Sequence, residues 1–474
     1  SYAGHRTEKF LCIWRNVDFI SINVHGNYFC RNRSCQQFKA RNKNGGKKMI
    51  VISVLLLLFI LLVIGVPIAF SLAISGISAI FVLGDVPLTY IFQRFYMGSE
   101  SYSLVALPMF ILAGNIMNRG GVSRRLIDFA GSLLGRMRGG LGMITIVASA
   151  FFGAISGPAT GTSAAIGSMM IPTMIKKGYD PGYSAAIVSA SSSLGIVIPP
   201  SLPLILYGSV SGLSVGMLFL AGVPLGIIMS MVYMFVTHFL ALKYKLPLGE
   251  NKISVRSIVR AFLPAIPALT LPVLILGSII YGIATPTETA GMAVVLSIIV
   301  SVAYKEIDID IFVRCLRESL VGSATVMLII ASGDLLGWAL TYLEAAQELM
   351  NLMLSFATSN ISIMIIASII LLIAGFVFDG TVMVIIIVPL FLPLVKHAGI
   401  DPLQFAMVVL MCWCIGQQTP PVASGLYVST AIAGVDMIYA AKYIIYYIVA
   451  LTFILLALIF FPDYILYFSK IVSG

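Results

Sequence analysis

The chain has 474 residues, of which 59% are hydrophobic and only 10% are charged, and its formal net charge is +10. A soluble globular domain carries roughly 25% charged residues, so this composition excludes a water-soluble protein and predicts a membrane protein. The long apolar stretches lack strict alternation, which favours membrane-spanning helices over the strands of a closed barrel.

The basic character belongs to the N-terminal segment. Residues 1–48 contain ten Lys/Arg and two acidic residues, whereas residues 49–474 contain nineteen Lys/Arg and seventeen Asp/Glu. The net charge therefore does not predict a nucleic-acid ligand. The segment also lacks the charged, apolar and small-residue order of a signal peptide. We expect residues 1–48 to be non-native or disordered, with Met49 opening the first span; a genuine basic extension is the alternative.

The predicted spans follow in chain order. As one helix, residues 50–83 would measure about 51 Å, which is too long for a hydrocarbon core of about 30 Å. Gly65-Val66-Pro67 therefore divides them into two short spans. Further spans are predicted at about 103–118, 183–208, 214–242, 262–282, 288–304, 320–342, 403–428 and 437–461.

Two more apolar regions are interrupted near the middle. Residues 141–176 contain Ser156-Gly157-Pro158, and residues 361–396 contain Asp379-Gly380. Each flank is short for a full crossing, so each region predicts a helical hairpin that enters the membrane and turns back. Such irregular backbone is tolerated only where protein or a water-filled cavity surrounds it.

An internal repeat relates the two halves of the chain. Helix-breaking residues recur at a constant separation of 221 positions, too many to attribute to chance. The pairs are Pro172 and Pro393, Asp180-Pro181 and Asp401-Pro402, Gly195 and Gly416, Pro199-Pro200 and Pro420-Pro421, and Thr160 and Thr381. Residues 49–245 and 246–474 thus form two repeats, each with a hairpin and a helix (183–208 or 403–428) broken before Pro-Pro.

Charge predicts that the two repeats have opposite orientations. The segments that flank the first hairpin are rich in Arg and Lys, whereas their counterparts carry mainly Glu and Asp. By the positive-inside rule, the first hairpin starts from the cytoplasm and the second from the opposite face. Inverted repeats with broken helices are typical of secondary transporters.

The chemistry is expected where these helices stop inside the membrane. Helix N-termini favour anions and C-terminal carbonyls favour cations, so oxygen-rich tips suit Na⁺ and a carboxylate. Small Ser, Gly and Thr residues also mediate helix packing. Asp379 is an ionisable residue inside an apolar segment, which indicates an ion or gating role; helix capping is the alternative. Glu288 is either structural or involved in coupling.

Several other functions lack a motif. No GxxxxGK[ST] sequence occurs, so ATP does not bind this chain through a P-loop. His238 and His397 are isolated, and Cys412-Trp413-Cys414 has neither zinc nor redox spacing, so packing is the simpler role. No catalytic constellation is evident, which makes an enzyme the least favoured class.

At these motifs the chain resembles the large membrane subunit of tripartite ATP-independent periplasmic (TRAP) transporters of the C4-dicarboxylate and sialic acid type. The resemblance covers essentially residues 49–474. It rests on Ser156–Thr162, Ala164-Ala165-Ile166-Gly167-Ser168, Gly195-Ile196-Val197-Ile198-Pro199-Pro200-Ser201, Ala284-Thr285-Pro286-Thr287-Glu288 and Thr419-Pro420-Pro421-Val422.

The resemblance implies an elevator-type importer in the bacterial inner membrane, driven by a Na⁺ gradient and needing no other cofactor. It implies two partners, a small membrane subunit and a periplasmic binding protein that delivers a carboxylate. Carried over, one sodium site takes Ser156, Gly157, Gly195 and Ile198, and the other takes Asp379, Thr381, Gly416 and Thr419. Neighbouring substrate contacts are expected at Pro158, Thr160, Thr162, Ser201, Gly380 and Pro420. Two departures occur: Gly380 replaces a commoner hydroxyl, and Ala423-Ser424-Gly425 replaces the usual Gly-Thr-Asn.

Two other functions stay open at this level. One is a stand-alone ion-coupled anion transporter or antiporter of related fold, and the other is a passive channel. The sequence does not identify the carboxylate, which could be a C4-dicarboxylate, sialic acid or a sugar acid.

Overall fold

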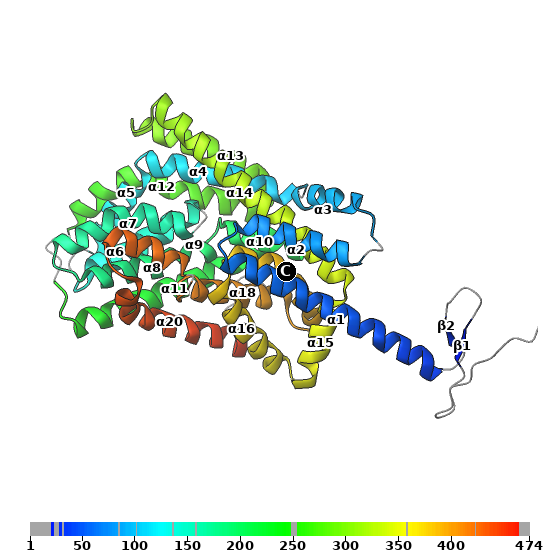
Figure 1. The fold of residues 1–474 in the computed structure, drawn as a ribbon. Coiled ribbons are helices and arrows are strands. Elements are labelled where there is room, and N and C mark those ends of the chain that lie inside the picture. Colours follow the sequence, from blue (N-terminus) through cyan, green and yellow to red (C-terminus); the bar gives the residue numbers. More distant parts are fainter. Residues whose placement is uncertain are drawn as a thin grey trace, which may run out of the picture.

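The computed structural model describes residues 20–22, 28–30, 33–83, 86–100, 102–134, 137–156, 159–247, 254–356, 359–421 and 423–463. These residues are almost entirely helical (Figure 1). Within them the two strands are β1 (Ile20–Ile22) and β2 (Tyr28–Cys30), which pair antiparallel with Ile20 opposite Cys30. The predicted all-α class is confirmed.

The helices of the first half are bounded as follows: α1 Arg33–Val63, α2 Ile68–Leu83, α3 Thr89–Ser99, the 3₁₀ turn Tyr102–Val105, α4 Ala106–Arg119, α5 Val122–Leu134, α6 Gly140–Ser156, α7 Ala159–Lys176, α8 Pro181–Ser192, α9 Leu194–Val197, α10 Leu202–Ser211 and α11 Val215–Lys243. Those of the second half are α12 Val255–Ile280, α13 Pro286–Ala303, α14 Ile309–Tyr342, α15 Ala345–Phe356, α16 Asn360–Val377, α17 Gly380–His397, α18 Pro402–Gly416, α19 Ser424–Ala433 and α20 Met437–Phe460.

Seven of the described helices are long and apolar enough to cross a membrane. They are α11, α12, α13, α14, α16, α17 and α20, and the bent pair α8–α10 makes an eighth if it counts as one span. The bend of 43° lies at the first Pro-Pro sequence. The chain is therefore a multi-pass membrane protein.

Some boundaries differ from the predicted ones. Helix α1 begins at Arg33, so residues 33–48 are helical rather than disordered. Midway along this helix, Lys47 and Lys48 form ion pairs with Glu344, which directly precedes α15, and with Glu348 of α15. The rest of residues 1–48, apart from the two strands, lies outside the described residues.

Short helices were the main omission of the sequence analysis. Helices α3, α5 and α15 have 11 to 13 residues, too few to cross a membrane, so the span pattern does not reveal them. The segment 403–428, expected as one broken helix, forms α18 and α19, and α19 continues to Ala433. Pro420-Pro421 separates these helices because proline supplies no backbone N–H.

Equivalent caps and helix bounds occur twice, 221 residues apart. Asp180 Oδ1 accepts hydrogen bonds from Gly182 N (2.8 Å) and Tyr183 N (3.1 Å), and so caps α8. Asp401 caps α18 in the same way through Leu403 N, at 2.9 Å. Each helix has proline at its first position, where the missing N–H costs nothing. Helices α7 and α17 begin and end at matching positions of the two halves.

The two halves interlock instead of packing as separate bodies. Helix α2 packs on α14 and α4 packs on α13, while α19 lies against α7 and α8, and α10 against α17. Helices α8 and α18 are buried from Gly182 to Ser192 and from Leu403 to Gly416. The broken helices thus form the centre of the molecule.

Candidate functional site

Glycines bring each hairpin against its broken helix. A Cβ on Gly153 of α6 would lie 2.7 Å from Gly195 Cα in α9. In the second half, a Cβ on Gly416 of α18 would lie 2.6 Å from the carbonyl oxygen of Gly375 in α16. Side chains at these contacts would force the backbones apart, because both approaches are shorter than ordinary van der Waals contact.

The first predicted ion site lies partly in the described structure. A Cβ on Gly195 would lie 3.4 Å from Thr162 Oγ1, which places this hydroxyl of α7 beside the broken helix. Ser201 Oγ donates to Ile196 O at 2.6 Å, and so occupies one carbonyl at the end of α9. Ile198 caps α9 in an extended conformation. Two further predicted ion ligands at the tip are Gly157 and the Ser156 side chain, and Pro158 is a predicted substrate contact. All three lie outside the part of the structure that is described.

The second predicted ion site is described throughout. Asp379 Oδ1 accepts a hydrogen bond from Thr381 N at 3.0 Å and caps α17, so the capping alternative for this carboxylate is observed. The other carboxylate oxygen has no hydrogen-bond partner within the described part of the chain, and remains available. Thr419 Oγ1 donates to Ile415 O at 2.8 Å, one residue from Gly416.

Trp413 explains the glycine at position 380. A Cβ on Gly380 would lie 2.0 Å from atoms of the Trp413 indole ring, so no hydroxyl-bearing residue fits there. The ring is 8% exposed and lies against the second tip. The Cys412-Trp413-Cys414 sequence predicts packing but does not show which tip the ring meets, so this role is visible only in the structure.

A cavity of about 130 Å³ joins the two halves between the tips. Polar lining comes from Thr160, Asp379, Thr381, Gln417 and Ser424, and apolar lining from Leu107, Ala159, Ile196, Leu202, Pro203, Leu206, Val326 and Trp413. Four of the helices that contribute begin here: α7 at Ala159, α10 at Leu202, α17 at Gly380 and α19 at Ser424. No Lys or Arg lines the cavity among the residues that the structure describes.

The predicted substrate contacts divide into three groups. Thr160 lines the cavity. Thr162, Ser201 and Gly380 are buried beside it without lining it, whereas Pro420 is exposed. Asp379 and Thr381, predicted as ion ligands, also line the cavity, so the second ion site and the cavity share residues.

Glu288 has a structural role in the described fold. Its Oε2 accepts hydrogen bonds from Thr285 N (2.7 Å) and Thr285 Oγ1 (2.8 Å), while Thr285 Oγ1 caps the first turn of α13. This reciprocal capping box stabilises the start of the helix. The geometry therefore favours the structural interpretation of Glu288 over the coupling interpretation.

Asp334 is a half-buried acid, with a buried Oδ2, that is not among the predicted site residues. It lies inside the apolar helix α14, and its Oδ2 has no hydrogen-bond partner in the described residues. Gly98 lets α3 approach closely, since a Cβ there would lie 2.8 Å from Asp334 Cβ. Asp334 and Arg94 of α3 both line a cavity of about 380 Å³. The Arg94 guanidinium also lies over the Trp338 ring. An acidic residue within an apolar span was the available signal.

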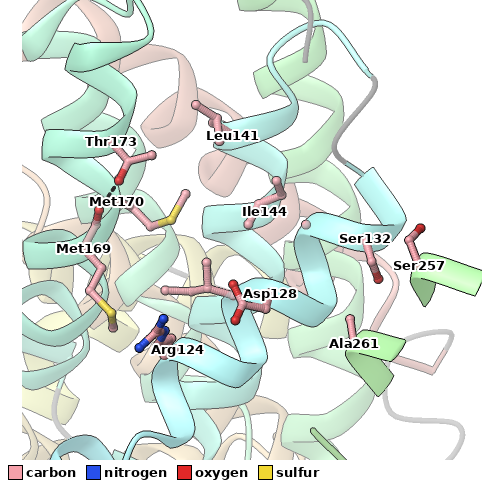
Figure 2. A pocket seen from close by; sticks show the side chains of 12 residues that line it. Arg124, Asp128, Ser132, Leu141, Ile144, Met169, Met170, Thr173, Ser257 and Ala261 are labelled. Atoms are coloured by element: carbon pink, nitrogen blue, oxygen red, sulfur yellow. Dashed lines mark hydrogen bonds between the residues drawn. The ribbon is translucent and has the colours of Figure 1, made fainter. Parts of the chain in front are cut away.

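The hairpins meet their neighbouring short helices differently in the two halves. A crevice of about 590 Å³ separates α5 from α7 (Figure 2), and Arg124 and Asp128 project into it from α5. In the other half, α15 packs directly on α17, where Ala345 joins Val382 and Ile386 in a buried cluster. The structure is therefore open beside the first hairpin and closed beside the second.

Broken central helices, two hairpins and a cavity between their tips define a helical membrane transporter. The chain matches the family described as "Tripartite ATP-independent periplasmic transporter, DctM component" over residues 55–464, and it belongs to this family. The resemblance inferred from the sequence motifs is thereby confirmed.

Individual relatives agree with the family assignment. The chain is 33% identical to the 2,3-diketo-L-gulonate TRAP transporter large permease protein YiaN of Escherichia coli, over 85% of this chain and 95% of YiaN. It is 35% identical to the C4-dicarboxylate TRAP transporter large permease protein DctM of Pseudomonas aeruginosa, over 77% of this chain and 86% of that protein. Both relatives are transporter permeases.

A solved structure shares the fold. The crystal structure of the Alcanivorax borkumensis YdaH transporter superposes with a TM-score of 0.54 at 13% sequence identity. The match covers 78% of this chain and 88% of YdaH.

Proposed function

We propose that this chain is the permease subunit that carries a small organic anion, coupled to Na⁺, through the cavity between the two hairpin tips. The observation that carries the proposal is the meeting of four helix N-termini, those of α7, α10, α17 and α19, at this cavity. The unpaired N–H groups and partial positive charge of helix N-termini favour a carboxylate. Hydroxyls of Thr160, Thr381 and Ser424 add further donors.

Sodium supplies the positive charge that the side chains of the cavity lack. The C-terminal ends of α9 and α18 present carbonyl oxygens at the breaks. Asp379 lines the same cavity as Ile196 of α9 and Gln417, which follows α18. Hard cations prefer oxygen ligands of this kind. Bound Na⁺ therefore stabilises the bound carboxylate, and the carboxylate in turn stabilises bound Na⁺, which is the basis of coupled transport.

The movement that we propose is an elevator motion of the hairpins and broken helices between inverted repeats. The open crevice between α5 and α7 and the packed contact between α15 and α17 support this motion. If α5 packed on α7 and a crevice opened between α15 and α17, the second hairpin would become accessible in place of the first. Ala345 and Ile386 belong to one buried cluster where α15 packs on α17, and their equivalents 221 residues earlier are Arg124 and Ala165. A cysteine pair at 124 and 165 should cross-link only in the exchanged state, whereas a pair at 345 and 386 should cross-link only in the present one. Simultaneous, condition-independent linkage of both pairs would argue against the motion.

The partners follow from the tripartite family. We propose a small membrane subunit beside this chain and a periplasmic protein that delivers the substrate, both at the bacterial inner membrane. The names of the relatives support a C4-dicarboxylate or a sugar acid, with sialic acid as a further candidate. The substrate itself is to be found by screening these acids.

Uptake by proteoliposomes tests the proposal. The chain is reconstituted with its small subunit, and labelled acids are presented with and without the binding protein under an inward Na⁺ gradient. We expect accumulation above equilibrium that requires both the binding protein and Na⁺. Accumulation without the binding protein would indicate a stand-alone transporter, and equilibration without accumulation would indicate a passive channel.

A further inference from the structure

One buried phenol connects the two broken helices. Tyr233 of α11 is fully buried, and its hydroxyl lies 2.8 Å from Ser193 Oγ at the end of α8. The same hydroxyl lies 3.3 Å from Gln418 Nε2, just beyond the end of α18. Ser193 and Gln418 belong to different halves of the chain, so this side chain joins them.

The donors and acceptors of the connection can be assigned in full. Ser193 Oγ donates its hydrogen to Ala190 O at 2.7 Å, so the Tyr233 hydroxyl must donate to Ser193 Oγ. Gln418 Nε2 donates one hydrogen to Cys414 O at 3.0 Å and the other to Tyr233. The phenol therefore accepts a longer bond from one broken helix and donates a short bond to the other, which is the pattern that a neutral hydroxyl allows.

The connection lies next to both predicted ion sites. Ser193 precedes Gly195 by two positions, and Gln418 directly precedes Thr419. The helices also touch at this level, where Cys414 Sγ lies 3.6 Å from Ser193 O; these two residues are themselves 221 positions apart. The hydroxyl of Tyr233 thus lies where equivalent points of the two repeats meet.

The repeat itself does not require this hydroxyl. The position 221 residues after Tyr233 is Ile454, which provides no hydrogen bond. A side chain needed only to build the repeated fold would be expected in both halves. The Tyr233 hydroxyl therefore adds a hydrogen-bonded link that has no counterpart in the second repeat.

We infer that Tyr233 is a positioning residue that couples the two sodium sites, an inference that rests on the proposed Na⁺ coupling. Sodium at the first site orders the end of α9 and, through Ser193, holds the phenol. The phenol then holds Gln418 and orients the backbone that leads to Thr419. Binding at one site thereby favours binding at the other, which appears as cooperative Na⁺ dependence.

Tyr233→Phe tests the inference, because it removes the hydroxyl and keeps the ring. Tyr207→Phe is the matched control: Tyr207 is also fully buried, but its hydroxyl has no hydrogen-bond partner in the described structure. Purified protein with its small subunit is titrated with Na⁺ at constant ionic strength, and the melting temperature is followed. We expect Tyr233→Phe to raise the half-saturating Na⁺ concentration about three- to tenfold and to lower the Hill coefficient towards one. Tyr207→Phe should leave both unchanged.

Ser193→Ala cuts the same link from the other end and provides a second route if Tyr233→Phe does not fold. It should reproduce the loss of cooperativity, and the double variant should add no further shift. A lower melting temperature with unchanged Na⁺ half-saturation and Hill coefficient would show that Tyr233 only packs, and would overturn the inference. A wild type that does not respond to Na⁺ would instead overturn the proposed function itself.

Discussion

Replacing Gly416 with alanine should disturb the second ion site through the backbone alone. The added Cβ would lie 2.6 Å from the carbonyl oxygen of Gly375 and 2.9 Å from its Cα, and backbone atoms cannot turn aside as a flexible side chain does. Ordinary contact begins at 3.4 Å. Helix α18 must therefore move away from α16 by about 0.8 Å, the shortfall from ordinary contact, and it carries Gly416 and the carbonyls around it.

The same contact provides an internal control. A Cβ on Gly375 would meet Cys412 O and Gly416 Cα at 3.4 Å, within ordinary contact distance. Overpacking costs about 1–3 kcal/mol, which corresponds to a loss of about 5- to 150-fold if it is expressed in Na⁺ affinity. Gly416→Ala should therefore weaken Na⁺ binding by such a factor, whereas Gly375→Ala should change it by less than about twofold.

Two measurements decide this prediction. Na⁺ titration of the melting temperature gives the affinity, and uptake by proteoliposomes at several Na⁺ concentrations gives the half-saturation for transport. The reasoning is refuted if Gly416→Ala keeps the wild-type Na⁺ dependence, or if Gly375→Ala is impaired to the same extent.

Two further predictions concern the second hairpin tip, and a third concerns the Asp180 cap of α8. Asp379→Asn keeps a good helix cap but removes the charge, so it should weaken Na⁺-dependent uptake about tenfold while thermal stability without Na⁺ is kept. Asp379→Ala also removes the cap, so it should lose about 0.5–2 kcal/mol of stability in addition. Wild-type Na⁺ dependence of uptake in both variants would reject the ion role. Gly380→Ser should destabilise the second tip by about 1–3 kcal/mol, measured by denaturation. If the ring is the obstacle, the same change should cost less in a Trp413→Ala background than in the wild type. Burial raises the pKa of Asp180, but hydrogen bonds from the Tyr439 hydroxyl and from backbone N–H groups, together with the Lys442 charge, outweigh it and hold the pKa below its ordinary 3.8. This contribution to stability is present at neutral pH and is lost as the pH falls from about 4 through the lowered pKa. Tyr439→Phe should therefore lower the melting temperature at neutral pH and reduce its further loss below pH 4; an unchanged difference between neutral and acid melting temperatures would count against the link.

The local structure of this protein follows from its sequence. The Pro-Pro pairs end helices locally, although single prolines such as Pro172 and Pro393 lie inside α7 and α17. An Asp followed by Pro caps a helix with its own side chain, so Asp180 and Asp401 mark two helix starts without reference to anything distant. The membrane class follows in the same way, because apolar length and scarce charge decide whether a segment tolerates lipid. Family motifs then correctly indicated a TRAP permease subunit.

Only the tertiary structure decided which of these breaks meet. The four helix starts at the cavity lie as far apart as Ala159 and Ser424, and their convergence depends on how the two halves interlock. The ring that forbids a side chain at Gly380, the half-buried acid at Asp334 and the phenol of Tyr233 each act through contacts with other helices. Residues more than 100 positions apart are brought together by packing and register, which no local pattern encodes, and at this site the distant contacts carry the chemistry.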